Sequence, residues 1–586
     1  MILSPHVLLD QENPAQLIRK LSDPFFQEIR ERNLQALHLM QTTPGRDLFD
    51  RPKWLLHPDH GQCQFPWRML KARLLRAGIE RVLSQSDRLD DFLRETLVHF
   101  LDAEQWKVFW PQCRLQFMDL KMGDLLYCGV FIREFMPDLL TEAEHTHLEH
   151  LLVEKGLRAY LLGIEAQEWW ATCPHNWNSA THGNAGLLAL HLEASHPDLC
   201  ALVLTQVRAG LRPLIEAFPA EGGWTEGMMY CTTALAHLTD FVAALDRVKG
   251  TTWGIAENPR IHATLDWRRH FLAPDGKVFN FSNCSTNAEE WPMAQVYWWA
   301  IKARRPEWAS FEDAHPRPFE QVDGVFHDVE AFLYREANQP TADWHVPSGL
   351  SHFRGLDWLS WRGGDAWFAL RAGFSGGNHN QHDLGSFIFG VGEDRLVIDP
   401  GYGVLSASEH STVTFKHLEQ LWGATCPILR AEVSGEFAHI IVDLAPAQPG
   451  LLAVHLRHFI LAPLGMLVIV DYIRSKDYTQ HDAKYHLQLA FEPSRHSTGL
   501  GARFRERDVL VLLPCPTANL EITEKKAGSH YAVSWQDDRD GVETIHATMI
   551  STQSPCEINV RGREVTGRLG TTAFVLDTHS SSLRLE

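Results

Sequence analysis

The sequence predicts an α+β protein of more than one domain, with helices in its N-terminal part and antiparallel β-sheets in its C-terminal part. Two observations support this. The chain has 586 residues, more than one hydrophobic core usually serves, and 45% of them are hydrophobic. Helical patterns dominate up to about residue 330, and short β-prone runs follow from about residue 350. We therefore expect two domains, over residues 1–338 and 339–586.

Helical signals follow one another in the N-terminal part. Thr141 and Glu144 form a capping-box pattern ahead of leucines at helical spacing. Comparable amphipathic stretches run over Asp91–Phe109 and Leu202–Phe218. Because neither alternating strands nor a fixed repeat period accompanies these helices, we expect a helical array or toroid rather than a solenoid.

The C-terminal part contains short β-prone runs separated by Gly, Pro and Asp turns. These runs are Trp358–Trp361, Ala366–Leu370, Met466–Val470 and Val509–Leu513. They predict a stack of antiparallel sheets. The joint between the domains is expected at the polar, proline-bearing segment Asn338–Asp343.

The formal net charge of −19 argues against a general nucleic-acid-binding protein. It would also repel a polyanionic sugar unless basic residues gather locally. Candidates for such a gathering are Arg268, Arg269 and His270, or Arg354 and Arg362. Solvated surface charges are the alternative interpretation of each of these residues.

Other features of the composition limit the compartment and the kind of site. The ten cysteines include no CxxC pair, which disfavours a zinc-thiolate site and gives no disulfide framework. No uninterrupted apolar run approaches the roughly 20 residues that span a bilayer, so we expect a soluble protein without a membrane partner. Met1–Pro5 shows no secretory signal. The protein is expected in the cytoplasm, or secreted or periplasmic with its signal removed.

Three segments concentrate polar residues next to glycines: 176–184, 221–230 and 376–387. The third packs two histidines, three amides and a carboxylate together, and a run ending at Val397–Gly401 follows it. A strand interior has little use for so many polar groups, so this segment indicates a site.

Together the three segments resemble the motifs of the heparinase II/III-like polysaccharide lyases, in that family's order. The resemblance covers most of the chain, from Ser4–Leu9 through the strand-rich part. It implies an incomplete (α/α) toroid followed by an antiparallel β-sandwich of stacked sheets. It also implies an enzyme that cleaves uronic-acid-containing glycans, such as hyaluronan, chondroitin sulfate and heparan sulfate, by β-elimination to unsaturated oligosaccharides.

Such an elimination removes the C5 proton of the uronate and expels the C4 oxygen without water. The site must neutralise the C6 carboxylate, place a base at C5 and place an acid at the leaving oxygen. Neutral hydrogen-bond donors, a tyrosine and histidines suffice for these three tasks.

The first segment offers hydrogen-bond donors. Asn178 and His182 are four residues apart and share one face if the segment is helical, and Asn176 can donate to a carboxylate. We expect Asn176 and His182 in catalysis, and Asn178 and Trp177 in substrate binding. The structural alternative makes the asparagines helix caps and His182 a partner of a backbone carbonyl.

The second segment places Tyr230 four residues after Glu226. A tyrosine can give its proton to a leaving oxygen, although its ordinary pKa of about 10 makes it a reluctant base. By resemblance Tyr230 is the catalytic tyrosine, and a core tyrosine is the alternative. Glu226 is expected to bind substrate, or to orient a histidine or a sugar hydroxyl. Arg362 is a further expected substrate contact.

The third segment supplies His379, which by resemblance is the catalytic histidine, as base or as carboxylate neutraliser. Whether His379 or Tyr230 is the base stays open. The family commonly has His-x-His-x-Asp here, with the second His and a later Asp binding zinc. In this chain Gln381 replaces that His, Asp399 matches the aspartate, and His439 is a loose third candidate. Such a set suits Mn or Ca better than Zn, and a metal-free turn is the alternative.

Three other functions compete with a glycosaminoglycan lyase. One is an alginate lyase of the same mechanism. Another is a hydrolase, which needs two carboxylates about 5–10 Å apart, for which Glu221 and Glu226 are available. The third is a non-catalytic carbohydrate-binding relative, for which 20 tryptophans offer stacking surface. The expected partner is an acidic polysaccharide, and no organic cofactor is expected. The polymer, the mode of cleavage and the oligomeric state stay open.

Overall fold

The computed structural model describes residues 6–9, 16–42, 60–102, 106–107, 117–285, 293–314, 328–416, 418–477, 479–514, 517–525, 530–537, 539, 541–553 and 556–586. Met1–Pro5 and residues 103–105, 108 and 109, which took part in the predictions above, lie outside these ranges.

The chain splits into two compact units. The helical unit comprises Met1–Phe218, Cys231–Leu265 and Glu289–Trp344, and the sheet unit comprises Pro219–Tyr230, Asp266–Ala288 and His345–Glu586. The first strand begins at Gly349, close to the expected joint. Two segments from the helical half of the sequence nevertheless belong to the sheet unit. The predicted single boundary after residue 338 does not include these two segments in the sheet unit. They are short and lie among helices, so the composition of the sequence does not change where they begin and end.

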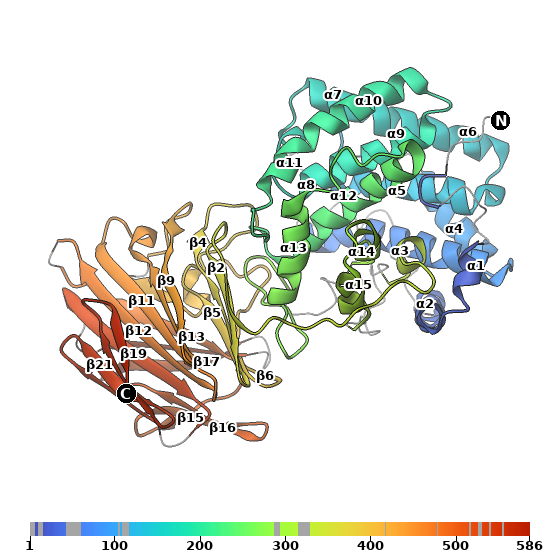
Figure 1. Ribbon diagram of the computed structural model, residues 1–586. Helices are drawn as coiled ribbons and strands as arrows, with labels where there is room; N and C mark the ends of the chain where they lie inside the picture. Colours follow the sequence, from blue (N-terminus) through green and yellow to red (C-terminus); the bar gives the residue numbers. More distant parts are fainter. Residues whose placement is uncertain are drawn as a thin grey trace. The chain divides into compact units, whose positions relative to one another are not determined.

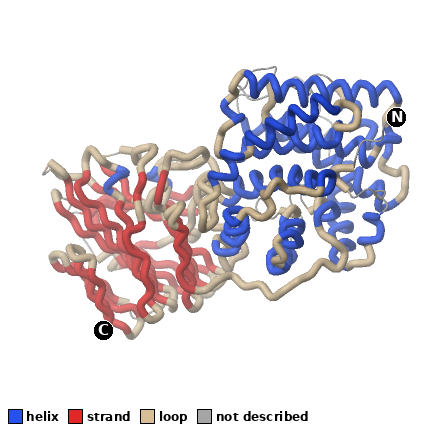
Figure 2. The backbone as a smooth tube through the Cα atoms, turned by 45° about the horizontal axis from the view of Figure 1, so that its top comes forward, coloured by secondary structure: helices blue, strands red, loops and turns tan. Residues whose placement is uncertain are grey.

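Helices in series make up the N-terminal part, shown from blue to yellow-green in Figure 1 and in blue in Figure 2. This confirms the predicted helical part of the fold. The helices are α1 (Gln16–Lys20), α2 (Pro24–Thr42), α3 (His60–Ser84), α4 (Asp90–Phe100), α5 (Leu120–Phe135), α6 (Glu142–Leu151), α7 (Ala159–Glu165), α8 (Asn176–Asn178), α9 (Asn184–Leu192), α10 (Pro197–Gly210), α11 (Arg212–Ala217), α12 (Met228–Lys249), α13 (Pro259–His270), α14 (Val296–Lys302), α15 (Pro306–Asp313) and α16 (Ala331–Tyr334).

Local signals in the sequence set several helix ends. Thr141 caps α6 by accepting from the backbone of Glu144, whose carboxylate accepts from the backbone of Thr141 in return. The predicted capping box is therefore confirmed. The stretch Leu202–Phe218 is not one helix, because α10 ends at Gly210 and α11 has Pro213 in its first turn. A proline has no N–H to donate, so it fits the start of a helix but interrupts its interior.

The C-terminal part is built from antiparallel sheets, which confirms the predicted fold class. The strands are β1 (Gly349–Phe353), β2 (Trp358–Gly363), β3 (Ala366–Arg371), β4 (Gly373–Phe374), β5 (Phe387–Val391), β6 (Asp394–Val397), β7 (Val413–Phe415), β8 (Thr425–Cys426), β9 (Ile428–Ser434), β10 (Phe437–Asp443), β11 (Leu452–Ala462), β12 (Met466–Ser475), β13 (Ala483–Leu489), β14 (Ser494–His496), β15 (Gly499–Phe504), β16 (Arg507–Leu512), β17 (Thr517–Lys525), β18 (His530–Asp537), β19 (Glu543–Ser551), β20 (Glu557–Arg561), β21 (Glu564–Leu569), β22 (Thr572–Asp577) and β23 (Ser582–Leu585).

The strands form three main sheets in the described residues. A nine-stranded sheet has the order β1-β2-β3-β5-β6-β13-β18-β17, with β7 beside β13, and an eight-stranded sheet has the order β14-β15-β16-β19-β12-β11-β10-β9. The third has the order β20-β21-β22-β23, and β4 pairs with β8 alone. One hydrophobic core joins the first two sheets and a second joins the eight-stranded sheet to the third. The eight-stranded sheet is therefore the middle layer of the stack.

Strand β12 shows why an almost continuous apolar run forms a strand here. Leu467 and Ile469 face the first core, while Val468 and Val470 face the second. Successive side chains of a strand point to opposite faces, so a strand buried on both sides needs apolar residues at every position.

Aromatic side chains from Asp266–Ala288 cover the outer face of the nine-stranded sheet. The ring of Trp358 on β2 lies 5.8 Å from that of Phe271 and 5.7 Å from that of Phe281. This contact attaches the segment to the sheet unit and places Ser282 and Asn283 beside the loop that follows β4.

One helix among the described residues, α12, is long and apolar enough to cross a membrane. Its apolar window is 78% buried inside the structure, so packing within the protein accounts for its composition.

Candidate functional site

The centre of the candidate site is a contact between Glu226 and His379, which are 153 positions apart in the sequence and both belong to the sheet unit. The distance from His379 Nδ1 to Glu226 Oε1 is 2.6 Å. The histidine is 21% exposed, whereas the carboxylate is 1% exposed. A carboxylate accepts hydrogen bonds, so this contact places the proton on Nδ1 and leaves Nε2 as the basic nitrogen.

Glu226 is held by two further donors. Its Oε2 accepts from the indole of Trp224 at 3.0 Å, and its Oε1 also accepts from the side chain of Asn378 at 2.8 Å. Both carboxylate oxygens are therefore occupied. This geometry favours the alternative in which Glu226 orients a histidine over direct binding of a sugar.

Tyr230 lies against the face of the same histidine ring. The rings of Tyr230 and His379 stack with centroids 3.6 Å apart and an angle of 13° between their planes. The Tyr230 hydroxyl lies 3.5 Å from that of Tyr402. A phenol and an imidazole are therefore in direct contact. Such groups can serve as the acid and the base of an elimination.

The sequence around Tyr230 explains how it reaches this position. Gly227, just before α12, has φ of 87°, and a Cβ on it would lie 2.6 Å from the carbonyl oxygen of Phe281. Only glycine fits this close approach without strain. The chain can therefore turn tightly between Glu226 and the start of α12 and present both residues to His379.

The loop that carries His379 is fixed from two sides. Asn380 donates to the carbonyl oxygen of Thr225 at 2.7 Å and accepts from the backbone N–H of Gly377 at 3.1 Å. The carbonyl oxygen of His379 accepts from the backbone N–H of Asn283 at 3.0 Å. These bonds connect all three segments of the sheet unit around the histidine.

Tyr402, Trp224 and Asn378 belong to this site although the sequence did not single them out as site residues. Trp224 and Asn378 lie inside the polar segments described above, so their position was a signal that could have found them. Tyr402 follows the Asp399–Gly401 turn and carries no comparable signal.

The residues expected from the first polar segment lie in the helical unit. Asn176, Trp177 and Asn178 form α8, which continues through a π-helical turn over Ser179–Gly183 into α9. All three are buried. Asn178 donates from its amide to the carbonyl oxygen of Gly210 at 2.8 Å. The segment is helical as expected, and π-helical turns occur frequently at functional sites.

His182 is fully buried and both of its ring nitrogens are occupied. Nδ1 accepts from the hydroxyl of Tyr160 at 2.7 Å, and Nε2 donates to the carbonyl oxygen of Ala171 at 3.0 Å. Burial lowers the pKa of His182 to about 4, so the ring is neutral. This geometry favours the structural alternative, a histidine that is the partner of a backbone carbonyl.

Arg362 is tied to the protein backbone. Its guanidinium donates to the carbonyl oxygens of His270 at 2.8 Å and Leu272 at 2.5 Å, and burial lowers its pKa to about 10. The neighbouring Arg269 pairs with Asp266 at 2.6 Å. These cations connect parts of the sheet unit, so their contacts do not favour a role in binding a polyanion.

Each of the three residues suggested as metal ligands contacts another protein group in the part of the chain that the structure describes. Asp399 accepts from the backbone of Gly401 at 3.0 Å, and its other oxygen lies 3.0 Å from His410 Nδ1. The amide nitrogen of Gln381 donates to the carbonyl oxygen of Gly401 at 2.9 Å. His439 lies on β10, where its Nε2 faces His458 at 3.2 Å. No cluster of three His, Cys, Asp or Glu side chains suited to a metal occurs among the described residues. These contacts do not test the expected Gln-Asp-His set, so the metal stays a prediction.

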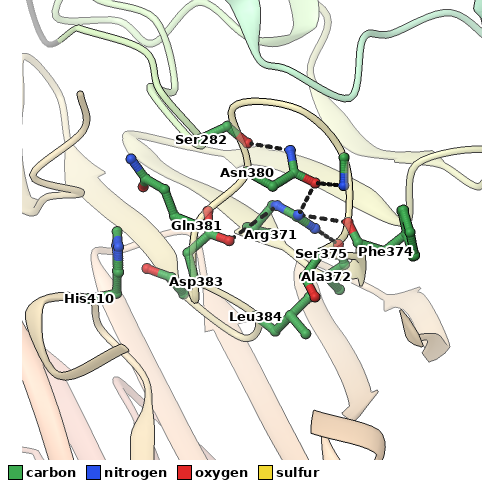
Figure 3. A network of polar contacts seen from close by, with 12 residues as sticks. Ser282, Arg371, Ala372, Phe374, Ser375, Asn380, Gln381, Asp383, Leu384 and His410 are labelled. Carbon is green, nitrogen blue, oxygen red and sulfur yellow. Dashed lines mark hydrogen bonds and ion pairs between the residues drawn. The ribbon is translucent and has the colours of Figure 1, made fainter. Parts of the chain in front are cut away.

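A buried polar network joins Arg371 to Asn380 and Asp383 of the loop that follows β4 (Figure 3). Arg371, from the end of β3, donates to the carbonyl oxygen of Phe374 at 2.8 Å, and its Nε lies 3.5 Å from Asp383. Burial raises the pKa of Asp383. Burial alone would lower the pKa of His410, but Asp399 outweighs it and raises that pKa to about 9. The protein's own cations therefore balance these two buried carboxylates.

The fold is similar to that of solved polysaccharide lyases. Heparinase III matches with a TM-score of 0.60 at 12% identity, covering 91% of this chain and 84% of that one. A heparan sulfate lyase from Pedobacter heparinus matches at 0.55 and 12% identity, covering 91% and 84%. The Streptomyces coelicolor chondroitin AC lyase in complex with chondroitin sulphate matches at 0.54 and 12% identity, covering 95% and 88%. At these identities the similarity establishes the fold alone. No curated protein matches the chain.

A helical part followed by stacked antiparallel sheets is the fold that this chain shares with these solved lyases. Residues 345–552 match the family model of the heparinase II/III-like C-terminal domain. This match confirms, over that part of the chain, the resemblance seen in the sequence.

Proposed function

We propose that this protein is a polysaccharide lyase that cleaves uronic-acid-containing glycosaminoglycans by β-elimination. The observation that carries the proposal is His379 held between the buried carboxylate of Glu226, at 2.6 Å, and the stacked ring of Tyr230. The names of the similar structures support the substrate class, because they include a heparan sulfate lyase and a chondroitin lyase bound to chondroitin sulphate.

In the proposed reaction His379 Nε2 removes the C5 proton of the uronate. The positive charge that forms on the imidazole is stabilised by Glu226 through Nδ1, as a carboxylate does for a catalytic histidine generally. The Tyr230 hydroxyl gives its proton to the C4 oxygen as the C4–O bond breaks. A proton then passes from His379 to the Tyr230 phenolate, which restores both groups for the next cycle.

Neutralisation of the C6 carboxylate needs further donors. Asn176 is the residue that we propose for this task. Asn178 and His182 donate to the carbonyl oxygens of Gly210 and Ala171, and the part that we propose for them is to fix the helix that carries Asn176.

The geometry does not favour a hydrolase. That mechanism needs two carboxyl groups that reach the substrate and water. Glu226 is 1% exposed, with both oxygens occupied, and Glu221 accepts from the backbone of Gly355 at 3.0 Å.

The test is ultraviolet absorbance over time with hyaluronan, chondroitin sulfate, heparan sulfate, heparin and alginate. Turnover of a glycosaminoglycan creates a double bond and therefore absorbance. Tyr230→Phe should lower kcat by about 100-fold or more, because it removes the general acid. Tyr531→Phe on β18 is the matched control and should leave kcat unchanged. Absence of absorbance with every polymer, or full activity of Tyr230→Phe, would refute the proposal.

A further inference from the structure

Exposed aromatic side chains gather on the loops next to His379. Phe374, Tyr402 and Trp422 are 49%, 51% and 50% exposed. Leu405 and Leu421 on the same loops are also exposed. A soluble protein rarely leaves several large apolar side chains together in water unless they contact a ligand or a partner.

These loops touch one another. The ring of Trp422 lies edge-on to that of His382, with centroids 5.5 Å apart, and the backbone N–H of His382 donates to the carbonyl oxygen of Leu405 at 3.1 Å. A Cβ placed on Gly376 would lie 2.4 Å from the ring of Phe374 and 2.9 Å from Gly423. The ring of Phe374 therefore lies against the loop that carries Trp422.

The aromatic residues sit on anchored backbone. Phe374 lies on β4, opposite Thr425 of β8, and its carbonyl oxygen accepts from the buried Arg371 (Figure 3). Leu421, next to Trp422, donates from its backbone to the carbonyl oxygen of Ala447 at 2.8 Å. A surface fixed before binding loses less conformational entropy when a ligand arrives.

The surface also continues into the catalytic pair. His382 follows His379 by three positions, so their Cα atoms are within roughly 11 Å of each other. The hydroxyl of Tyr402 lies 3.5 Å from that of Tyr230. A chain bound at Tyr230 and His379 can therefore reach Trp422 with a neighbouring sugar.

We propose that Trp422 and Phe374 form a stacking platform for the apolar face of an uncharged sugar ring, such as a hexosamine, next to the uronate that is cleaved. The proposal rests on the proposed function. Aromatic faces pack well against apolar surfaces, and sugar rings carry such a face in their C–H groups. Residues 372–378, 402–408 and 418–424 contain no lysine or arginine, so a sulfate or carboxylate finds no cation on these loops.

The experiment compares Trp422→Ala and Phe374→Ala with Leu464→Ala. Leu464 is 59% exposed in the turn between β11 and β12, beside Gly570, away from these loops. Two quantities are measured for each variant: kcat and KM from ultraviolet absorbance, and Kd for heparan sulfate and chondroitin sulfate by calorimetry in a Tyr230→Phe background. Circular dichroism melts check folding, and the half-exposed positions make large losses of stability unexpected.

We expect Trp422→Ala and Phe374→Ala to raise KM and Kd by about tenfold with little change in kcat, and Leu464→Ala to change neither. A wild-type protein that cleaves a polymer, with unchanged KM and Kd in both variants, would overturn the platform and leave the proposed function intact. A wild-type protein that binds without cleaving would overturn the proposed function, and the Kd of the variants would still decide on the platform. A wild-type protein that neither binds nor cleaves heparan sulfate or chondroitin sulfate would overturn the proposed function and the platform together.

Discussion

His379 holds its backbone in the left-handed region, with φ of 58°, although it is not a glycine. Such a conformation costs on the order of 1–3 kcal/mol and persists only where the surroundings impose it. Here Glu226 fixes the ring, and Asn283 donates to the carbonyl oxygen of His379. This strained backbone is consistent with a functional role for His379, because the conformation directs its ring toward Glu226 at a cost in local stability.

At the same scale, Glu226→Gln should lower kcat by about 100-fold with little change in KM, because the amide cannot stabilise a protonated His379 and loses one of its accepting oxygens. Steady-state kinetics on the cleaved polymer measure this. Glu221→Gln, on the same segment but exposed, should keep kcat within about twofold. Unchanged turnover in a correctly folded Glu226→Gln protein would rule out the orienting role.

Among the elements, the start of α12 depends on Gly227. Gly227→Ala adds a Cβ at φ of 87° and within 2.6 Å of the Phe281 carbonyl oxygen, so the turn must shift and displace Tyr230. We expect a loss of about 1–3 kcal/mol in the free energy of unfolding, together with at least about a tenfold loss in kcat.

Gly250, at the other end of α12, is the matched control. It also has a positive φ, of 65°, but a Cβ added there would meet nothing within 4 Å. Gly250→Ala should therefore cost stability only, about 1–2 kcal/mol, without a change in kcat. Chemical denaturation and kinetics separate the two effects, and equal kcat values for the two variants would contradict this account of Gly227.

Asp399, in the turn after β6, contacts His410 and is also an expected metal ligand, so both roles can be tested there. Asp399→Asn leaves the buried His410 without its carboxylate and should cost about 3–5 kcal/mol. Asp508→Asn removes an exposed partner of Arg503 and should cost at most about 1 kcal/mol. Treatment with a chelator should leave Tm unchanged, because protein groups already occupy the Asp399 oxygens. A fall in Tm on chelation, reversed by Mn, Ca or Zn, would contradict this.

For the whole molecule, the periodicity of the sequence predicted the fold. Helical spacing and one capping box located α6, and short apolar runs located β2, β3, β12 and β16. These are local signals, which a sequence displays directly. The break between α10 and α11 was missed because the amphipathic pattern continues through Pro213.

The site was predictable only in its parts. Tyr230, His379 and Glu226 each stood out, but spacing cannot reveal that residues 153 positions apart form a bond. Nor did it reveal that His182 is enclosed between Tyr160 and Ala171, because helix phase alone does not distinguish a groove from a core. Tyr402 directly follows the Asp399–Gly401 turn, which was interpreted as part of a metal site, and only the fold brings it to Tyr230.

Buried neutral histidines predict the response of the whole molecule to acid. Burial lowers the pKa of five of them well below the usual value of about 6.5. They are His182, His270 and His458, each at about 4, and His439 and His486, each at about 3. The unfolded chain binds protons at these positions below about pH 6.5, while the folded chain does not, so stability must be lost as the pH falls through that window.

We therefore expect Tm to fall continuously from pH 7 to pH 4.5, with each such histidine contributing up to about 1.4 kcal/mol per pH unit to the slope of the unfolding free energy below pH 6.5. Circular dichroism melts at several pH values measure this. The rings of His439 and His458 face each other. Replacing both with Gln should reduce the number of protons taken up on unfolding by up to two, because Gln does not titrate, and the slope of the unfolding free energy against pH should become shallower. A Tm that stays constant from pH 7 to pH 5, or an unchanged slope in the double variant, would show that these histidines are already charged in the folded protein.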